Sequence, residues 1–122
     1  MKRLSFIAIV LCTILFSQQL FAQSPKSETI KVWGNCGMCK KKIEKSAKSA
    51  GAITASWDAE KLELQMTYDE KETSSISIQQ AIANAGYDTQ DITADDKAYS
   101  KLSGCCKYER KAAIPSIINS NH

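Results

Sequence analysis

The chain has 122 residues, of which 43% are apolar and 24% are charged, so its length allows one domain and excludes a large multidomain enzyme. It contains 16 lysine and arginine residues against 13 aspartate and glutamate residues, which gives a formal net charge of +3. Two of the basic residues lie in a predicted leader, and the small excess that remains is not the charge of a nucleic-acid-binding protein.

Residues 1–22 are predicted to be a secretory signal peptide. Lys2 and Arg3 precede an uncharged apolar run at residues 4–16, and cleavage is expected after Ala22. The run has 13 residues, which is fewer than the roughly 20 that span a bilayer. We therefore expect an exported mature chain without a membrane span, in the periplasm or outside the cell.

The folded part is predicted to begin with a strand at residues 28–34, where Ile30 and Val32 alternate with other side chains. A helix is expected after the loop that follows. Ile43 and Ala47 recur there at helical spacing behind Cys39, while lysines and a glutamate fall on the other side.

Two further strands are predicted before a second helix. In residues 52–57, Ile53, Ala55 and Trp57 are expected to share one face, and residues 58–60 form a turn. The alternation in residues 62–68 predicts one face on the core and one in water, because every second side chain is apolar: Leu62, Leu64, Met66 and Tyr68.

The second helix is predicted to follow Ser74 or Ser75, either of which can accept backbone N–H bonds as its cap. Gly86 is expected to end this helix as Gly51 ends the first. A weak fourth strand at residues 89–93, around Ile92, would follow. The apolar positions of the second helix recur at helical spacing: Ile78, Ala81, Ile82 and Ala85.

The order β-α-β-β-α-β predicts an α+β fold of the ferredoxin-like kind, in which two helices pack on one face of a four-stranded antiparallel sheet. The domain would occupy residues 28–94, between the signal peptide and a C-terminal extension at 95–122. A domain this small is marginally stable, so a bound metal or a disulfide would add usefully to its stability.

The C-terminal extension has no sustained period of either kind and is expected to be partly ordered. Tyr99 and Tyr108 are predicted to hold it in place through their apolar rings. The extension also carries two adjacent cysteines, Cys105 and Cys106.

The chemistry of the predicted mature chain centres on cysteine, since the only histidine is His122. Cys36 and Cys39 form a C-x-x-C pair at the start of the first helix, where free N–H groups and the helix dipole favour thiolate over thiol. Gly34 and Gly37 are expected to let the loop wrap closely around a small ion. Converging thiolates select soft ions, above all Cu(I), which accepts two ligands, whereas a structural zinc ion normally requires four.

Four segments carry a resemblance to a known family: Ile-Lys-Val-Trp-Gly-Asn-Cys-Gly-Met-Cys, Cys-Lys-Lys-Lys-Ile-Glu-Lys, Gly-Ala-Ile-Thr-Ala-Ser-Trp-Asp and Ile-Gln-Gln-Ala-Ile-Ala-Asn-Ala-Gly-Tyr. Over residues 28–92 the chain resembles the heavy-metal-associated domain of copper chaperones, of metal-pumping ATPase modules and of the periplasmic mercuric-ion binding protein. The resemblance implies that Cys36 and Cys39 bind metal. It also places the family's aromatic residue at Tyr87, which either packs in the core or shields the metal loop from water.

The same resemblance implies a soft metal ion as ligand, most favourably Cu(I), with Zn(II), Hg(II) or another soft metal as alternatives. It further implies a metal-transporting membrane protein or a metal-accepting protein as partner. The family usually has Gly-Met-Thr-Cys before its first ligand, whereas this chain has Gly34, Asn35 and Cys36, so the core-facing methionine is missing. Met38 is expected to be a loop side chain rather than a replacement for it.

Cys105 and Cys106 are a second departure from the minimal family domain. Adjacent cysteines rarely bridge each other, because the ring strains the peptide. They are expected either to fold back as extra thiolate ligands beside Cys36 and Cys39, or to form structural disulfides in an oxidising compartment. A relay that transfers metal and a bond to another molecule are the remaining alternatives.

Three functions follow from these thiols. The favoured hypothesis is an exported soft-metal-binding protein, not an enzyme, that serves metal trafficking or sequestration. The alternative is a thiol–disulfide oxidoreductase that uses Cys36 or Cys39 as the attacking thiolate. The prolines of the mature chain, Pro25 and Pro115, lie outside the predicted domain, so the proline that thioredoxin-like folds place beside their C-x-x-C is missing. A third hypothesis makes the thiols purely structural in a domain that binds a protein partner.

Overall fold

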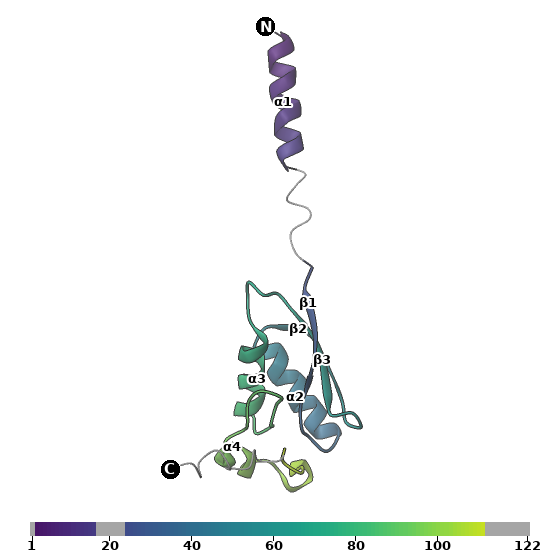
Figure 1. Cartoon of the computed structure of the whole chain (residues 1–122), viewed down its shortest axis with the longest axis vertical. Coiled ribbons are helices and arrows are strands. Elements are labelled where there is room, and N and C mark those ends of the chain that lie inside the picture. The colour runs from purple at the N-terminus through teal and green to yellow at the C-terminus, as the bar shows by residue number, and fades with distance from the viewer. Residues whose placement is uncertain (1, 17–23, 112–122) are drawn as a thin grey trace, which may run out of the picture.

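The computed structural model describes residues 2–16 and 24–111 of the chain (Figure 1). Two helices and three strands form the domain, and a short α-helix and a 3₁₀ turn follow them. The elements in chain order are α1 (Lys2–Phe16), β1 (Lys26–Lys31), α2 (Gly37–Ser49), β2 (Ala52–Asp58), β3 (Glu63–Tyr68), α3 (Ser75–Asn84), α4 (Asp96–Ser100) and η2 (Gly104–Cys106).

The apolar run of the predicted signal peptide is helical, as α1. None of the helices in residues 2–16 and 24–111 has the length and apolar character needed to cross a membrane. The expected cleavage position after Ala22 lies outside the described residues, and the signal peptide stays a prediction.

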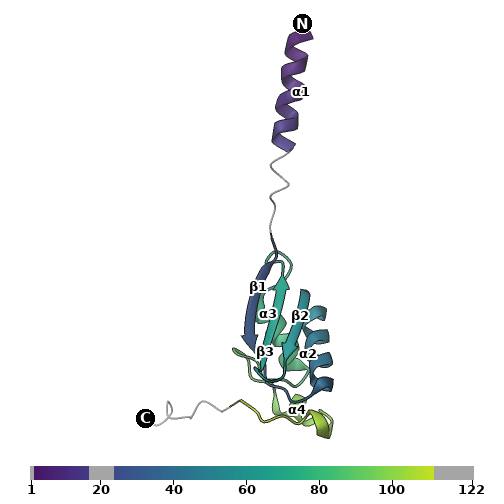
Figure 2. The same ribbon diagram turned by 90° about the vertical axis from the view of Figure 1, so that its right-hand side faces the viewer.

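The three strands form one antiparallel sheet in the order β1-β3-β2. Figure 2 shows them side by side, and Figure 1 shows α2 and α3 on the same side of the sheet. Leu64 on the central strand pairs with Ile30 on one side and with Trp57 on the other. These three side chains are buried, and together with Ile43 of α2 and Ile82 of α3 they form the centre of the core. The predicted α+β ferredoxin-like sandwich is therefore confirmed in its layers.

The alternation predicted for the third strand is confirmed at Leu64, Met66 and Tyr68, which are all buried. It does not extend to Leu62, which precedes β3 with a φ of 54° and is half-buried. The prediction for the second strand is wrong at Ile53, which is 55% exposed. A bulge lies at this residue, since Ala52 pairs with Tyr68 while the next pair is Thr54 with Thr67. One extra residue reverses the facing of the chain, so a strict period of two fails across it.

The fourth strand predicted at residues 89–93 is reduced to one isolated bridge between Val32 and Thr89. The chain turns back at once, because the Thr89 amide donates to the Ile92 carbonyl at 2.8 Å. Gln79 of α3 stabilises this turn by accepting from the Thr89 hydroxyl and from the Asp91 amide, both at 2.9 Å. Local hydrogen bonds thus take the backbone groups that a longer strand would use for pairing.

The helix ends follow the sequence prediction. Ser74 caps α3, and its hydroxyl accepts a hydrogen bond from the Ser77 amide at 3.1 Å. Gly51 and Gly86 follow α2 and α3 with φ of 107° and 106°, a backbone conformation that glycine adopts without strain. At Gly86 a side chain would also lie 2.9 Å from the Ala98 carbonyl oxygen, so the C-terminal segment packs directly over this turn.

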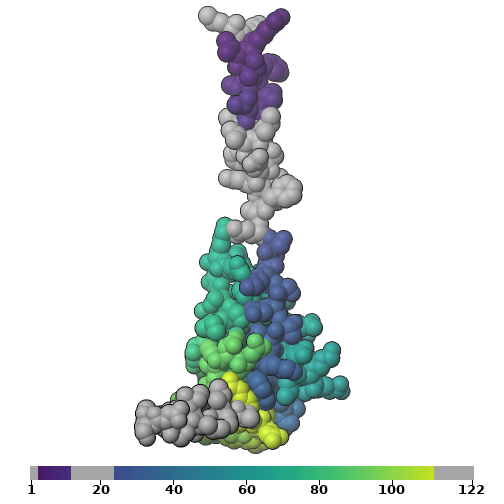
Figure 3. Space-filling view, in the orientation of Figure 1, coloured from purple at the N-terminus to yellow at the C-terminus, as the bar shows by residue number. Residues whose placement is uncertain are grey.

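We call residues 95–111 the tail; residues 112–122 of the predicted extension lie outside the described part. The tail runs through α4 and η2 and returns to the end of the domain where α2 begins. Figure 3 shows its yellow C-terminal portion against the blue segment that contains the C-x-x-C loop. The tail is therefore part of the fold and contributes Leu102, Cys106 and Tyr108 to the core.

Candidate metal centre

Cys36 lies at the entrance of the site. It is the N-cap residue of α2 with extended backbone angles, and its side chain is half-buried. Its sulfur makes no capping hydrogen bond of ordinary geometry, but the polar N–H of Cys39 interacts with it across the first helical turn. The Cys36 thiol instead donates to the Cys105 carbonyl oxygen at 3.4 Å, which links the loop to the tail.

Cys39 lies one turn into α2 and is completely buried. It belongs to the apolar face of this helix, together with Ile43 and Ala47, so helical periodicity directs its thiol toward the core. The sulfurs of Cys36 and Cys39 are 3.7 Å apart and form no disulfide. The sequence prediction that both thiols meet at the start of this helix is confirmed.

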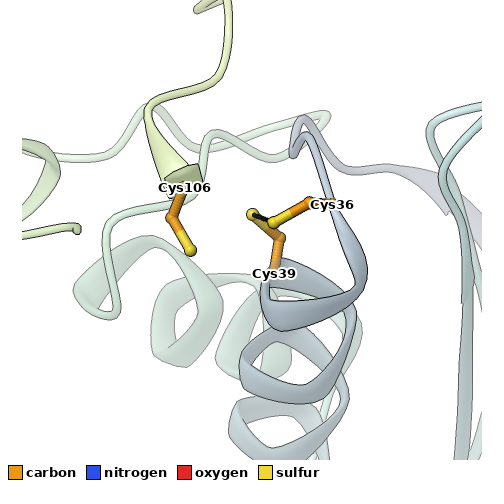
Figure 4. A group of neighbouring side chains, drawn as sticks. All are labelled: Cys36, Cys39 and Cys106. Carbon is orange, nitrogen blue, oxygen red and sulfur yellow. Dashed lines mark hydrogen bonds between the residues drawn. The ribbon is translucent and has the colours of Figure 1, made fainter. Parts of the chain in front are cut away.

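The tail adds a third thiol to this pair. Cys106 is buried in η2, and Figure 4 shows its side chain directed from the tail toward Cys36 and Cys39. The three sulfur atoms lie within 4.8 Å of one another. A metal ion bonded to three sulfurs at about 2.3 Å in a plane would hold them about 4.0 Å apart, so the spacing fits a three-sulfur site with small adjustments.

The donor set is also chemically uniform, because the group contains thiols and no carboxylate or imidazole. Soft ions prefer such a set, and hard ions such as Mg²⁺ and Ca²⁺ do not. The residues present therefore fit a soft metal ion.

The two C-x-x-C thiols differ in acidity. The N–H of Cys39 holds the pKa of the Cys36 thiol below its usual value and outweighs the opposing effect of burial. Burial raises the pKa of the Cys39 thiol. Cys36 is thus the thiol that is more readily available as a thiolate, and Cys39 loses its proton less easily unless a cation replaces it.

Tyr87 closes the inner side of the site. Its ring is fully buried, and within the described residues its hydroxyl group has no hydrogen-bond partner of ordinary geometry. Burial raises the pKa of Tyr87, and interactions with the Cys39 and Cys106 thiols raise it further. A buried hydroxyl that interacts with these thiols is suited to donate a hydrogen bond to a metal-bound thiolate. The two roles predicted for Tyr87 are therefore compatible, since it packs in the core and adjoins the site.

Buried hydrogen bonds hold the tail against the domain. The Tyr108 hydroxyl accepts from the Asp88 amide at 2.8 Å and donates to the Gly86 carbonyl at 2.7 Å. The Tyr108 ring stacks on Tyr87 with centroids 5.7 Å apart, and Tyr99 packs edge-on against it at 5.1 Å. The predicted role of Tyr99 and Tyr108 in fixing the tail is confirmed.

An ion pair that sequence reasoning did not find adds to this attachment. The fully buried Asp88 carboxylate accepts from Arg110 at 3.0 Å (Nε) and 2.8 Å (Nη2). Burial of Asp88 opposes its ionisation, but the bonds from Arg110 and from the Ala94 and Lys111 amides outweigh it and lower the pKa of the carboxyl. No local pattern relates residues 22 positions apart, so nothing in the sequence distinguished this pair from surface charges.

The loop glycines act differently from the sequence prediction. A Cβ atom on Gly34 would lie 2.9 Å from the Trp57 ring, whereas one on Gly37 would meet nothing within 4 Å. Gly34 is therefore required by the close approach of the loop to Trp57, which is buried and donates from Nε1 to the Val32 carbonyl at 2.9 Å. The sequence predicted that both glycines let the loop wrap around an ion. The structure instead gives Gly34 a role in packing against Trp57.

The four cysteines predicted as ligands fall into two groups. The structure brings Cys36, Cys39 and Cys106 together, while Cys105 is exposed and lies beside the Met38 sulfur at 3.7 Å. All four are free thiols. Cys105 Sγ is 3.9 Å from Cys106 Sγ, but it lies outside the group whose sulfurs are all within 4.8 Å of one another.

Comparison with solved structures identifies the fold. The chain matches the CopZ metallochaperone with 27% identity and a TM-score of 0.50, over 52% of this chain and 98% of that one. It matches oxidized MerP from Ralstonia metallidurans CH34 with 25% identity and a TM-score of 0.51, over 54% of this chain and 94% of that one. The chain has the fold of a heavy-metal-associated domain.

A third solved structure agrees with this fold at lower identity. It is the N-terminal domain of a potential copper-translocating P-type ATPase from Bacillus subtilis, with 22% identity and a TM-score of 0.52, over 55% of this chain and 86% of that one. No protein-family model and no curated protein matches the chain. The heavy-metal-associated fold thus occupies about half of this chain, and the remainder includes the tail that supplies Cys106.

Proposed function

We propose that this chain is a member of the heavy-metal-associated family that binds a soft metal ion as cargo through Cys36, Cys39 and Cys106. One observation carries the proposal: three thiol sulfurs lie within 4.8 Å of one another where α2 begins, on a fold shared with a metallochaperone. The third thiol is supplied by the tail, so capture of the ion joins the tail to the metal loop.

Cu(I) is the cargo that this site favours. Three thiolates, with no fourth ligand grouped beside them in residues 24–111, suit an ion that accepts low coordination, whereas structural Zn(II) is almost always bound by four ligands. Hg(II) shares the preference for thiolates and is the main competitor on chemical grounds.

The cellular role proposed here is trafficking or sequestration outside the cytoplasm, after removal of residues 1–22. The half-buried Cys36 is the thiol of this group that an accepting ligand reaches first, while Cys39 and Cys106 are buried. An ion can therefore pass by stepwise thiolate exchange to a metal-accepting protein or to a metal-transporting membrane protein. No catalytic step is proposed.

An anaerobic Cu(I) titration of the reduced protein against a competing chelator tests this function. We expect one tightly bound ion in the wild type and loss of tight binding in the Cys36→Ser, Cys39→Ser double variant. Cys106→Ser should lower the affinity at least about tenfold, because even groups that only support a metal ligand typically contribute 10–100-fold. Cys105→Ser is the matched control, since the Cys105 thiol lies outside the buried group. The Cu(I) affinity of this variant should stay within about threefold of the wild type, or about 0.65 kcal/mol.

Unchanged affinity in the double variant would refute the proposal. A parallel titration with Zn(II) examines the choice of ion, because a site limited to three protein sulfurs should prefer Cu(I). If the protein prefers Zn(II), the assignment of the site stands, but Zn(II) replaces Cu(I) as the proposed cargo.

The second candidate is a thiol–disulfide oxidoreductase, and the unequal acidity of Cys36 and Cys39 favours it. A half-exposed thiol with a lowered pKa beside a buried one at 3.7 Å is an arrangement that thiol exchange can use. Reduction of insulin disulfides by the purified protein measures this activity directly. We expect none above the rate of the Cys36→Ser variant.

A further inference from the structure

Two sulfur atoms outside the buried group lie together on the surface of the protein. The Cys105 thiol is 3.7 Å from the Met38 thioether sulfur, and both residues are exposed. Met38 belongs to the first turn of α2, between the two cysteines of the metal loop, and Cys105 belongs to η2 of the tail. We call Met38 Sδ and Cys105 Sγ the outer sulfur pair.

Packing alone does not account for this pair. Met38 is 50% exposed, although an apolar side chain gains free energy by burial. Its sulfur faces polar partners, because the Ser103 hydroxyl also approaches it at 3.8 Å. The tail thus directs a thiol and a hydroxyl at a thioether that remains accessible to solvent.

The outer sulfur pair is adjacent to the buried site. Cys105 Sγ is 3.9 Å from Cys106 Sγ, and Cys106 belongs to the buried group with Cys36 and Cys39. A continuous series of sulfurs therefore runs from the surface at Met38 to the completely buried Cys39.

We propose that Met38 and Cys105 form an outer two-sulfur site that accepts Cu(I) from solution and passes it through Cys106 to the buried three-thiol site. This inference rests on the proposed function, since it describes how the same cargo reaches the buried thiols. The ion needs no large displacement, because neighbouring sulfurs from Met38 to Cys106 are less than 4 Å apart, and the Cys106 sulfur lies within 4.8 Å of those of Cys36 and Cys39.

The transfer is a ligand exchange without redox chemistry. Cu(I) first bonds to Cys105 as a thiolate and to the neutral Met38 thioether, and the Cys105 proton goes to the solvent. Cys106 then bonds to the ion as its own proton leaves, while the bond to Met38 breaks. Cys36 and Cys39 then bond to the ion, and their protons go to the solvent. The bond to Cys105 breaks last, and Cys105 takes up the proton that Cys106 released; the copper stays Cu(I) throughout.

The thioether makes the outer pair selective for a class of ion. Soft thioether and thiolate ligands select Cu(I), whereas carboxylate, carbonyl and water ligands suit harder ions. Met38 should therefore assist a soft monovalent ion and should not respond to Zn(II).

Methyl NMR of the protein labelled with [methyl-¹³C]methionine detects the outer pair directly. In an anaerobic titration with Cu(I), we expect the Met38 methyl resonance to shift by the second equivalent, and Zn(II) to leave it in place. Met66 is the internal control, because it is 1% exposed in the core. The Cu(I)-dependent shift should be lost in Cys105→Ser, and a shift of the same size in that variant would overturn the proposal.

Stopped-flow transfer of Cu(I) from a chelator tests the path. Met38→Leu keeps an apolar side chain of similar size and removes the sulfur. We expect it to slow loading about tenfold, which corresponds to about 1.4 kcal/mol in the barrier, while the equilibrium affinity of the buried site stays unchanged. Ser103→Ala is the matched control, since it removes a neighbour of the same sulfur without removing a soft ligand.

The outcomes separate the two proposals. A Met38 resonance that stays in place up to two equivalents, or wild-type loading by Met38→Leu, overturns the outer pair even if the buried site binds tightly. If Ser103→Ala slows Cu(I) loading as much as Met38→Leu does, the effect comes from packing of the tail, and this outcome also overturns the proposal of the outer sulfur pair. If Cys36→Ser, Cys39→Ser binds as tightly as the wild type, the buried site itself fails, whatever Met38 does.

Discussion

Replacing Tyr108 with phenylalanine removes one hydroxyl group and tests how the tail is held. That hydroxyl accepts from the Asp88 amide at 2.8 Å and donates to the Gly86 carbonyl at 2.7 Å, and all of these groups are buried. Phenylalanine keeps the stacking on Tyr87 and the edge contact with Tyr99. The substitution therefore isolates the two hydrogen bonds from the aromatic packing.

The magnitude follows from the two backbone groups that lose their partner. A buried donor or acceptor left unsatisfied costs about 1–3 kcal/mol. Because both groups are affected, we expect the free energy of unfolding to fall by about 2–6 kcal/mol. This is a large part of the stability of a small domain, for which about 5–15 kcal/mol is typical.

Urea unfolding followed by tryptophan fluorescence measures this loss, since Trp33 and Trp57 both lie in the domain. Tyr68→Phe is the control, because the Tyr68 hydroxyl donates at 2.9 Å to the side chain of Glu28, a residue that is only half-buried. We expect that variant to lose no more than about 1 kcal/mol. A loss below about 0.5 kcal/mol in Tyr108→Phe, the scatter expected for a surface substitution, would refute the role assigned to the hydroxyl.

The tail can also detach before the domain unfolds, and that outcome is measurable. The Cys106 thiol is buried in the folded protein, so detachment exposes it to alkylating reagents. In Tyr108→Phe we expect faster alkylation of Cys106 and weaker Cu(I) binding. Unchanged protection of this thiol, together with unchanged stability, would show that other contacts hold the tail.

Three further predictions concern the charge, the loop and the cargo. The pKa of Asp88 is lowered by folding, so its stabilisation is present above about pH 4 and is lost as the pH falls through the folded-state pKa; urea midpoints from pH 7 to pH 3 should fall less steeply in Asp88→Asn. Gly34→Ala should destabilise the domain by about 1–3 kcal/mol through overlap with Trp57, and Gly37→Ala, which meets no neighbour, should leave the urea midpoint nearly unchanged. Excess free Cu(I) at about 100 times the dissociation constant should stabilise the wild type by about 2.7 kcal/mol in the same assay, and Cys106→Ser should gain less at the same free Cu(I) concentration.

Much of the fold followed from local patterns. The alternation of Leu64, Met66 and Tyr68, the cap at Ser74 and the positive-φ glycine at position 86 each depend on neighbouring residues, and each is confirmed. The prediction for Ile53 was wrong because the bulge at this residue depends on the register with β3, and alternation within one strand does not report that register. The fourth strand failed because Gln79, a residue of α3, stabilises the turn that replaces it.

The candidate site divides in the same way. The meeting of Cys36 and Cys39 was predictable, because a spacing of three residues at a helix start brings two side chains to the same turn. The distinction between Cys106 and Cys105 was not, since both were equal candidates in a segment without periodicity. Met38 was expected to be a loop side chain rather than a core methionine; it is exposed in the first turn of α2, and its contact with Cys105, 67 positions away in the chain, could not be predicted.

The sequence by itself determined the layers of the sandwich and the C-x-x-C pair, because hydrophobic period, helix caps and a three-residue spacing act over one or two turns of chain. Only the tertiary structure decided that the tail completes the site. Burial of the Tyr108 hydroxyl and pairing of Asp88 with Arg110 place Cys106 against the first two thiols. The strength of such contacts depends on removal from water, which arises only when distant segments pack together.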